Sequence, residues 1–112
     1  MAQDFERTLE QNISNNSGSP TTLRAATTTD DAIIGVRCTN TSGTAVNVSV
    51  YVENNTTNYF IIKEAPIPTG GSLELIDGGS KVVLMNGDAV KAYASAASSV
   101  DIITSVVDTI SA

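Results

Sequence analysis

The strongest pattern in the chain is an alternation of apolar and polar residues across Ala45–Glu53. Four valines alternate there with four other residues: Val46, Val48, Val50 and Val52 against Asn47, Ser49, Tyr51 and Glu53. Side chains alternate between the two faces of a β-strand. The segment is therefore predicted to be a strand with its valines on a core and its polar side outward, in solvent or lightly contacted.

The preceding segment, Ile33–Asn40, is also predicted to be a strand, with Ile34, Val36 and Cys38 on one face. Thr41-Ser42-Gly43-Thr44 then has the composition of a tight turn in which glycine supplies an unusual φ. Ile33–Asn40 and Ala45–Glu53 are accordingly predicted to form an antiparallel hairpin. Asn86-Gly87 is the strongest two-residue hairpin signal in the chain.

The N-terminal segment is less decisive. Phe5, Leu9 and Ile13 are spaced by four, which fits a helical stripe or alternate positions on one face of a strand. A polar loop, Ser14–Pro20, follows, and then a β-type segment, Thr21–Thr27. We favour a strand, a loop and a second strand, with an extended arm lying on a neighbouring subunit as the alternative.

The rest of the chain predicts more short strands separated by turns. Three of them, Tyr59–Lys63, Lys81–Met85 and Val100–Asp108, are apolar on both faces, so both faces should be covered and subunits or layers should meet there. Other predicted strands are Ser72–Ile76 and Asp88–Ser95. The predicted turns between them are Asn54–Asn58, Asp77-Gly78-Gly79-Ser80 and Ala96-Ala97-Ser98, and Pro66 and Pro68 indicate a strand end or a sheet edge.

This regular spacing predicts an all-β fold, an antiparallel β-sandwich or jelly-roll-like architecture of about eight to nine short strands. We expect residues 1–112 to form one domain, in which residues 1–20 are the N-terminal strand or arm plus its polar loop. No segment has a sustained helical pattern between the predicted strands, which argues against βαβ units.

Charge excludes several classes of partner. Twelve acidic residues against six basic ones give a net charge of −6, and the basic residues are scattered singly. A nucleic-acid or anionic-membrane surface needs clustered Lys and Arg, so we expect neither partner. The start of the chain has no basic and apolar leader, and no window approaches the length of a membrane helix. These features predict a soluble protein made in a cytoplasm.

Candidate chemistry is sparse. The sequence contains no histidine, which removes Ser-His-Asp and Cys-His sites and His-based metal sites. Cys38, the only cysteine, is expected to be a small buried core residue, with a reactive thiol or an intersubunit bridge as the alternative. Gly70-Gly71 and Gly78-Gly79 lack the spacing of a phosphate loop and are interpreted as turns.

Carboxylates are the remaining possibility for a glycosidase or calcium site. They are expected in turns and on solvated strand faces: Asp30, Asp31, Glu53, Glu64, Glu74, Asp77, Asp88, Asp101 and Asp108. No Asp-x-Asp-x-Asp loop occurs. We therefore predict no catalytic, cofactor-binding or metal-binding residues, no cofactor, and no enzymatic activity.

One run in the C-terminal part resembles a known family. Leu84-Met85-Asn86-Gly87-Asp88-Ala89-Val90-Lys91, followed by Ser95-Ala96-Ala97-Ser98-Ser99-Val100-Asp101, is similar to small structural proteins of tailed bacteriophages, especially marine cyanophages. In those, an L-x-x-G-D-x-[IV]-K strand leads to an S-A-A-S-S-[VA]-D turn. Ile34–Asn40, Val48–Val52 and Ala65-Pro66-Ile67-Pro68 resemble them as well. The resemblance implies a sandwich-fold virion component, and its motifs are strand and turn patterns that carry no functional residues.

Three hypotheses follow. The first is an accessory virion structural protein that acts by protein–protein contacts, most sharply a capsid decoration (cement) protein, with neck or tail attachment as the alternative position. It would be a homo-oligomer whose partners are the major capsid protein or neck and tail proteins, because an oligomer would cover the doubly apolar strands. The second is a module that binds host-surface glycan or receptor through end loops, with Asn54–Asn58 and Ser14–Ser19 as candidates. The third is an enzyme.

Overall fold

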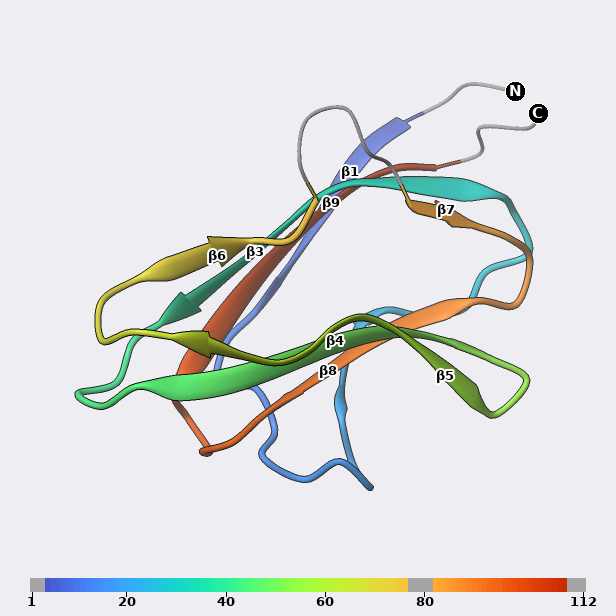
Figure 1. The fold of residues 1–112 in the computed structure, drawn as a ribbon. Helices are drawn as coiled ribbons and strands as arrows, with labels where there is room; N and C mark the ends of the chain where they lie inside the picture. Colours follow the sequence, from blue (N-terminus) through green and yellow to red (C-terminus); the bar gives the residue numbers. More distant parts are fainter. Residues whose placement is uncertain (1–3, 77–81, 109–112) are drawn as a thin grey trace.

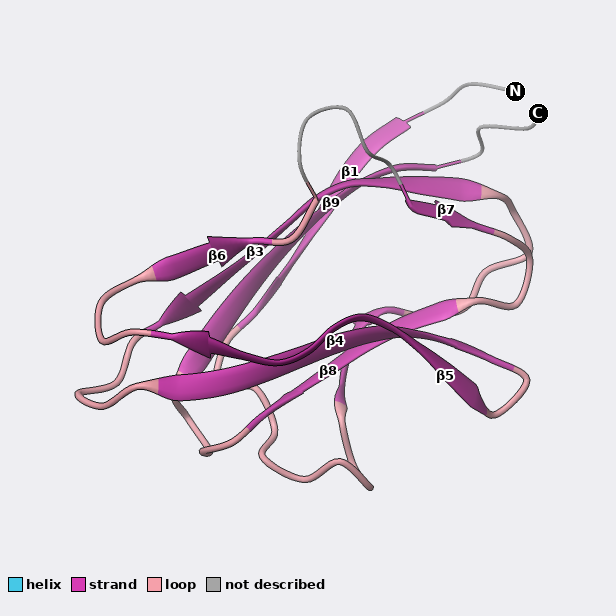
Figure 2. Cartoon of the chain, in the orientation of Figure 1, coloured by secondary structure: helices cyan, strands magenta, loops and turns pink. Residues whose placement is uncertain are grey.

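A computed structural model describes residues 4–76 and 82–108 of the chain. Strand is the only regular secondary structure among these residues (Figure 2), so the all-β prediction is confirmed. The predicted turn at residues 77–80, and Lys81 of the predicted strand that follows it, lie outside the described residues. The strands are β1 (Asp4–Glu10), β2 (Thr21–Arg24), β3 (Asp31–Asn40), β4 (Val46–Asn54), β5 (Thr57–Ile67), β6 (Ser72–Glu74), β7 (Val82–Leu84), β8 (Ala89–Ala94) and β9 (Val100–Asp108).

The strands form two antiparallel sheets that pack face to face (Figure 1). Sheet A has the order β1-β9-β3-β6, and β7 also pairs with β3. Strands β6 and β7 share one edge of β3, since β6 pairs with residues 37–39 and β7 with residues 31–33. Sheet B has the order β2-β8-β4-β5. With β6 and β7 in one position, this is the interleaved order of a jelly roll.

The interleaving overturns the hairpin predicted for residues 33–53. Strands β3 and β4 belong to different sheets, so residues 41–44 form a crossing between the sheets. The buried amide of Asn40 holds this crossing. Its Nδ2 donates to the carbonyls of Thr44 (2.8 Å) and Ile67 (3.0 Å), and its Oδ1 accepts from the backbone N–H of Ser42 (2.8 Å). Gly43 has no positive φ, because the Asn40 side chain rather than a left-handed glycine shapes the turn.

Asn86-Gly87 does form a turn, with the Asp88 N–H donating to the Met85 carbonyl and with Gly87 at φ 93°. It does not form a hairpin, because β7 lies in sheet A and β8 in sheet B. The tight hairpin joins β4 to β5 instead. There Asn55 and Thr56 both have positive φ, 51° and 67°, which is the geometry of a two-residue hairpin turn. The five-residue loop predicted at residues 54–58 thus shrinks to two residues.

The core lies between the sheets and is built from alternate residues of each strand. Val46, Val48 and Val50 of β4 are buried there as predicted. In β9 the inward row is Val100, Ile102, Thr104 and Val106, also as predicted. In β3, however, a bulge between Ile33 and Gly35 shifts the alternation. Ile33 is fully buried, whereas Ile34 is 37% exposed, so the predicted row of Ile34, Val36 and Cys38 is correct only for its last two members.

The N-terminal segment is a strand of the chain's own sandwich. Residues of β1 pair with β9 from Asp4↔Asp108 to Glu10↔Ile102, and the Thr8 hydroxyl donates to the Leu23 carbonyl at 2.8 Å. Ile13 lies beyond the strand and is fully buried. The strand interpretation is therefore confirmed over the arm. Phe5 and Leu9 nevertheless point away from the core.

A buried ion pair connects three strands at one end of the sandwich. Arg24 of β2 reaches Asp31 of β3 (3.1 Å) and Glu6 of β1 (2.7 Å). Asp31 is only 1% exposed and also accepts from the hydroxyls of Thr27 and Thr29. Burial lowers the pKa of the Arg24 guanidinium, but hydrogen bonds and charges from Glu6 and Asp31 outweigh this, so the pKa is raised. The prediction of a solvated carboxylate is wrong for Asp31.

Removing the buried carboxylate should destabilise the fold strongly. Asp31→Ala leaves the Arg24 charge buried with only its exposed partner Glu6, and we expect the free energy of unfolding to fall by about 3–5 kcal/mol. Glu6→Ala is the matched control, because the Glu6 side chain is 41% exposed, and it should cost less than about 1 kcal/mol. Urea denaturation of both variants measures the difference. Equal losses would contradict the assignment of Asp31 as the principal partner.

Candidate interaction surfaces

The outward side of sheet A carries apolar residues in rows that cross the strands. Antiparallel pairing places Phe5 beside Val107, Val107 beside Ala32, and Ala32 beside Val83. Paired residues share a face of the sheet. These four residues therefore form one apolar row across β1, β9, β3 and β7.

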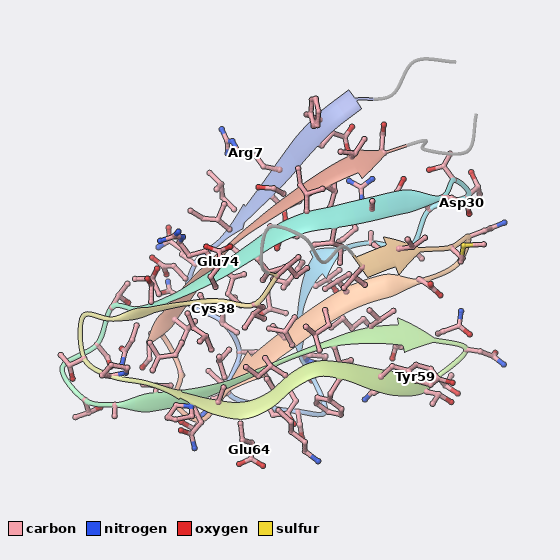
Figure 3. All side chains as sticks on the ribbon, turned by 45° about the horizontal axis from the view of Figure 1, so that its top comes forward. Arg7, Asp30, Cys38, Tyr59, Glu64 and Glu74 are labelled. Carbon is pink, nitrogen blue, oxygen red and sulfur yellow. The ribbon has the colours of Figure 1, made fainter. Side chains whose placement is uncertain are left out.

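A second row changes from apolar to charged along its length. Leu9 pairs with Ile103, Ile103 with Arg37, and Arg37 with Glu74. Arg37 and Glu74 form an exposed ion pair at 2.8 Å. Figure 3 shows Arg7, which lies between the two rows, projecting from β1 away from the sandwich.

We call the outward side of sheet A the sheet A face. Five of the eight large apolar side chains that are exposed among the described residues come from its strands: Phe5 (83%), Leu9 (58%), Val83 (53%), Ile103 (44%) and Ile34 (37%). Exposed apolar residues interspersed with charged ones, here two apolar rows with Arg7 between them, are typical of a protein-binding site. Two strands expected to be apolar on both faces, β7 and β9, thus expose apolar residues here.

The outward side of sheet B is different. Asn47, Ser49, Tyr51 and Glu53 point outward as predicted, but Ser49 and Tyr51 are only 1% and 2% exposed. The Tyr51 ring packs against Phe60 (centroids 5.1 Å apart) and Tyr93 (6.2 Å), and burial raises the pKa of Tyr51. The prediction of a polar face in solvent or lightly contacted is therefore wrong at its centre, because side chains of the neighbouring strands β5 and β8 cover Ser49 and Tyr51.

Charged residues surround this aromatic cluster. Lys91 pairs with Glu53 at 2.6 Å, and the hydrogen bond to Glu53 raises the pKa of Lys91. The Lys63 ammonium lies 5.0 Å from the Phe60 ring centroid, where a cation–π contact is favourable. The centre of the sheet B surface is thus covered by packed aromatic rings, and the charge of Lys91 beside them is paired with Glu53.

A β-bulge in β5 distorts the sheet beside this cluster. Val48 pairs with Ala65 and Val50 with Ile62, so Ser49 alone lies opposite two residues, Lys63 and Glu64. The Glu64 N–H donates to the Ser49 hydroxyl at 2.9 Å. Glu64 has φ 51°, a left-handed conformation that is costly for a residue with a side chain. Figure 3 shows Glu64 standing off the outer side of the strand.

A hollow opens next to the bulge, between β4, β8 and the loop that joins β1 to β2. Seven of its eight lining residues have polar side chains: Asn15, Ser17, Asn47, Ser49, Glu64, Tyr93 and Ser95, with Ala94 as the eighth residue. We call it the polar pocket. The predicted binding loop at residues 14–19 supplies Asn15 and Ser17. The other predicted loop, at residues 54–58, contributes to neither this pocket nor the shallow groove beside Leu9 and Ile103.

The loop over the pocket is fixed by hydrogen bonds. The Ala94 N–H donates to the Ser14 carbonyl (2.8 Å), and the Ser14 N–H donates to the Thr21 hydroxyl (2.9 Å). Within the loop, the Asn16 side chain accepts from the Gly18 N–H at 2.8 Å. Asn15 and Ser17 are therefore held over β8 by a loop anchored at Ser14.

The remaining sequence candidates are Cys38 and the carboxylates. Cys38 is fully buried, and burial together with the charge of Glu74 raises the pKa of its thiol to about 12. Among the residues that the structure describes, no three metal-binding side chains are grouped together. No helix in that part of the chain has the length and hydropathy to cross a membrane.

No protein-family model matches the sequence, and no curated protein matches it. A solved structure of Bacillus endospore appendages, which form a family of disulfide-linked pili, is similar in fold. That likeness covers 98% of this chain and 88% of that one, at a TM-score of 0.54 and 14% identity. A protein of the IBDV T13 viral particle aligns at a TM-score of 0.48 and 11% identity; 95% of this chain matches only 35% of that chain. The first likeness supports the sandwich fold.

The buried thiol gives a direct test of the core. Because Cys38 is inaccessible and its pKa is raised, a disulfide reagent at pH 8 should leave it unmodified in the native protein. Modification should become complete in denaturant. Rapid reaction of the native protein, followed by thiol absorbance, would contradict the burial of Cys38.

The left-handed Glu64 should be a site of stored strain. Glu64→Gly relieves the steric cost of φ 51°, and we expect the free energy of unfolding to rise by up to about 1 kcal/mol. Glu74→Gly is the matched control. Glu74 ends β6 and has no positive φ, so glycine there should be destabilising by about 0.5–1 kcal/mol. A loss of stability in Glu64→Gly, measured by urea denaturation, would show that the position is not strained.

Proposed function

We propose that the protein is a structural component of a virion that acts through protein–protein contacts, and that the sheet A face is where copies of the chain meet. The observation that carries this proposal is the concentration of exposed apolar side chains on that face. Phe5 and Leu9 alone are 83% and 58% exposed, which a second subunit would cover. The face also carries the cations Arg7 and Arg37 and the anion Glu74, so two copies can meet there without opposing uniform negative charge.

Two of the sheet edges are less suited to assembly than the face. One outer strand of sheet B, β5, carries Pro66 and the bulge at Glu64, both of which oppose pairing with another strand. One outer strand of sheet A, β1, presents the charged residues Glu6, Arg7 and Glu10. Association face to face therefore fits this chain better than strand addition at β5 or β1.

A sandwich of this kind is compatible with assembly, since the endospore appendage protein of similar fold belongs to disulfide-linked pili. This chain would assemble without disulfides, because its single cysteine is buried. The resemblance of its C-terminal run to phage structural proteins favours a tailed bacteriophage. Within that particle we propose a capsid decoration protein, because a net charge of −6 suits the outside better than the DNA-filled interior. Neck or tail attachment is the alternative.

Association should depend on the apolar rows. Leu9→Asp and Ile103→Asp each introduce a charge into the centre of the proposed contact, and both should convert an oligomer into monomers at micromolar concentration. Met85→Asp is the matched control, because Met85 is 56% exposed but lies in the turn after β7. Light scattering after size-exclusion chromatography measures the mass, and far-ultraviolet circular dichroism checks the fold. A monomeric wild type, or variants that still associate, would refute the contact.

The position in the particle requires a separate experiment. Purified protein should co-sediment with phage heads if it decorates the capsid, and with tails or neck complexes in the alternative arrangement. Subunit-resolution imaging of the particle would then place it. A chain that neither associates with itself nor binds heads or tails is not a virion component of this kind.

A further inference from the structure

The side chains of the polar pocket take no part in the proposed contact between copies of the chain. The pocket lies on the outward side of sheet B, across the sandwich from the sheet A face. Within the described part of the chain, no hydrogen bond uses the side-chain amides of Asn15 and Asn47, the carboxylate of Glu64 or the hydroxyl of Tyr93. These groups are free to meet a ligand, and they provide both donors and acceptors.

The pocket is shaped in advance. Glu64 is turned outward by the bulge and held by the hydrogen bond from its N–H to the buried Ser49 hydroxyl. Bulges beside functional sites redirect side chains, and non-glycine residues with positive φ are concentrated at such sites. On the opposite wall, the loop anchored at Ser14 carries Asn15 and Ser17. Both walls are therefore fixed before a ligand arrives, which lowers the entropic cost of binding.

The side chains that line the pocket favour some classes of ligand over others. The lining contains one carboxylate and no cationic residue, which disfavours phosphate and other anions. Ala94 is its only aliphatic side chain, which disfavours a lipid or an apolar peptide. A single carboxylate also falls short of the several charged oxygen ligands that hold calcium tightly. Amides, hydroxyls, a carboxylate and the edge or face of one tyrosine ring suit a neutral molecule with many hydroxyl groups and an apolar C–H surface.

We propose that the polar pocket binds a neutral sugar residue of a glycan. Asn15, Asn47 and Glu64 would hydrogen-bond its hydroxyls, and Tyr93 would contact its ring. The hollow has a volume of about 180 Å³, below the range of about 300–1,000 Å³ for drug-sized ligands, so it would hold a single sugar unit and leave the rest of the glycan in solvent. The site would stay open in an oligomer formed through the sheet A face, so that an assembled particle would display several copies. The inference does not require that assembly.

The test titrates the purified full-length chain with a panel of neutral and N-acetylated mono- and disaccharides, followed by backbone amide NMR. A glycan array then searches longer ligands. At least one neutral sugar at millimolar concentration should shift amide signals of residues 15–17, 47–49, 64 and 93–95. Weak affinity for a single unit is expected, and display of several copies would raise the apparent affinity on the array.

Three substitutions separate this site from nonspecific binding. Glu64→Gln keeps the size of the side chain and removes its charge, and it should weaken binding about tenfold. Tyr93→Phe keeps the ring and removes only the hydroxyl, so it should weaken binding less than Asn47→Ala. Glu74→Gln, on the opposite sheet, is the matched control and should bind as the wild type does. The dispersion of the amide spectrum verifies that each variant is folded.

The proposal is overturned by three results. No shift with any sugar and no array signal would exclude a glycan site. Shifts that persist unchanged in both Glu64→Gln and Asn47→Ala would place binding elsewhere. Shifts produced only by calcium chloride or by phosphate would show that the pocket is an ion site.

Discussion

Burial of the valines of β4 between the two sheets is the packing interaction on which the other surfaces depend. Successive side chains of a strand point to opposite faces of the sheet. A residue buried in the core therefore places its two neighbours in the strand on the outer face. Val48 and Val50 inside place Ser49 and Tyr51 outside, next to Tyr93 and Phe60. Ile102 and Thr104 inside β9 likewise place Ile103 outside, beside Leu9. The apolar face and the polar pocket are thus two consequences of one core.

The interleaved topology is a second constraint on the chain. Six of the eight connections between its strands cross from one sheet to the other. A crossing takes backbone groups out of a ladder, and those groups need other partners. Asn40 is such a partner at one end, where it bonds the carbonyls of Thr44 and Ile67. At the β2–β3 crossing, Asp31 binds Arg24, Thr27 and Thr29. These polar contacts hold the two sheets together at the ends of the sandwich, beyond the apolar core.

The two outer sides differ in the chemistry that they offer. Sheet A presents exposed Phe5, Leu9 and Ile103 beside ion-paired charges, which suits burial against a protein. Sheet B covers its centre with Tyr51 and its aromatic neighbours and leaves a polar hollow at the bulge of β5. In the proposed roles, sheet A attaches the protein to its partners and sheet B displays the pocket. The buried Cys38 takes part in neither.

The sequence by itself determined the all-β class, most strand positions and the inward rows of β4 and β9, because a period of two is a local property that burial enforces. It also identified β9 as apolar on both faces, and the structure leaves Ile103 on the outer face 44% exposed. Only the tertiary structure decided which strands pair: turn residues such as Asn86-Gly87 specify a local reversal of the chain, and the same reversal serves a hairpin or a crossing. Burial of Tyr51, Ser49 and Asp31 likewise depends on neighbours distant in sequence. The orientation of Glu64 follows from a register shift against Ser49, which no pattern within β5 encodes.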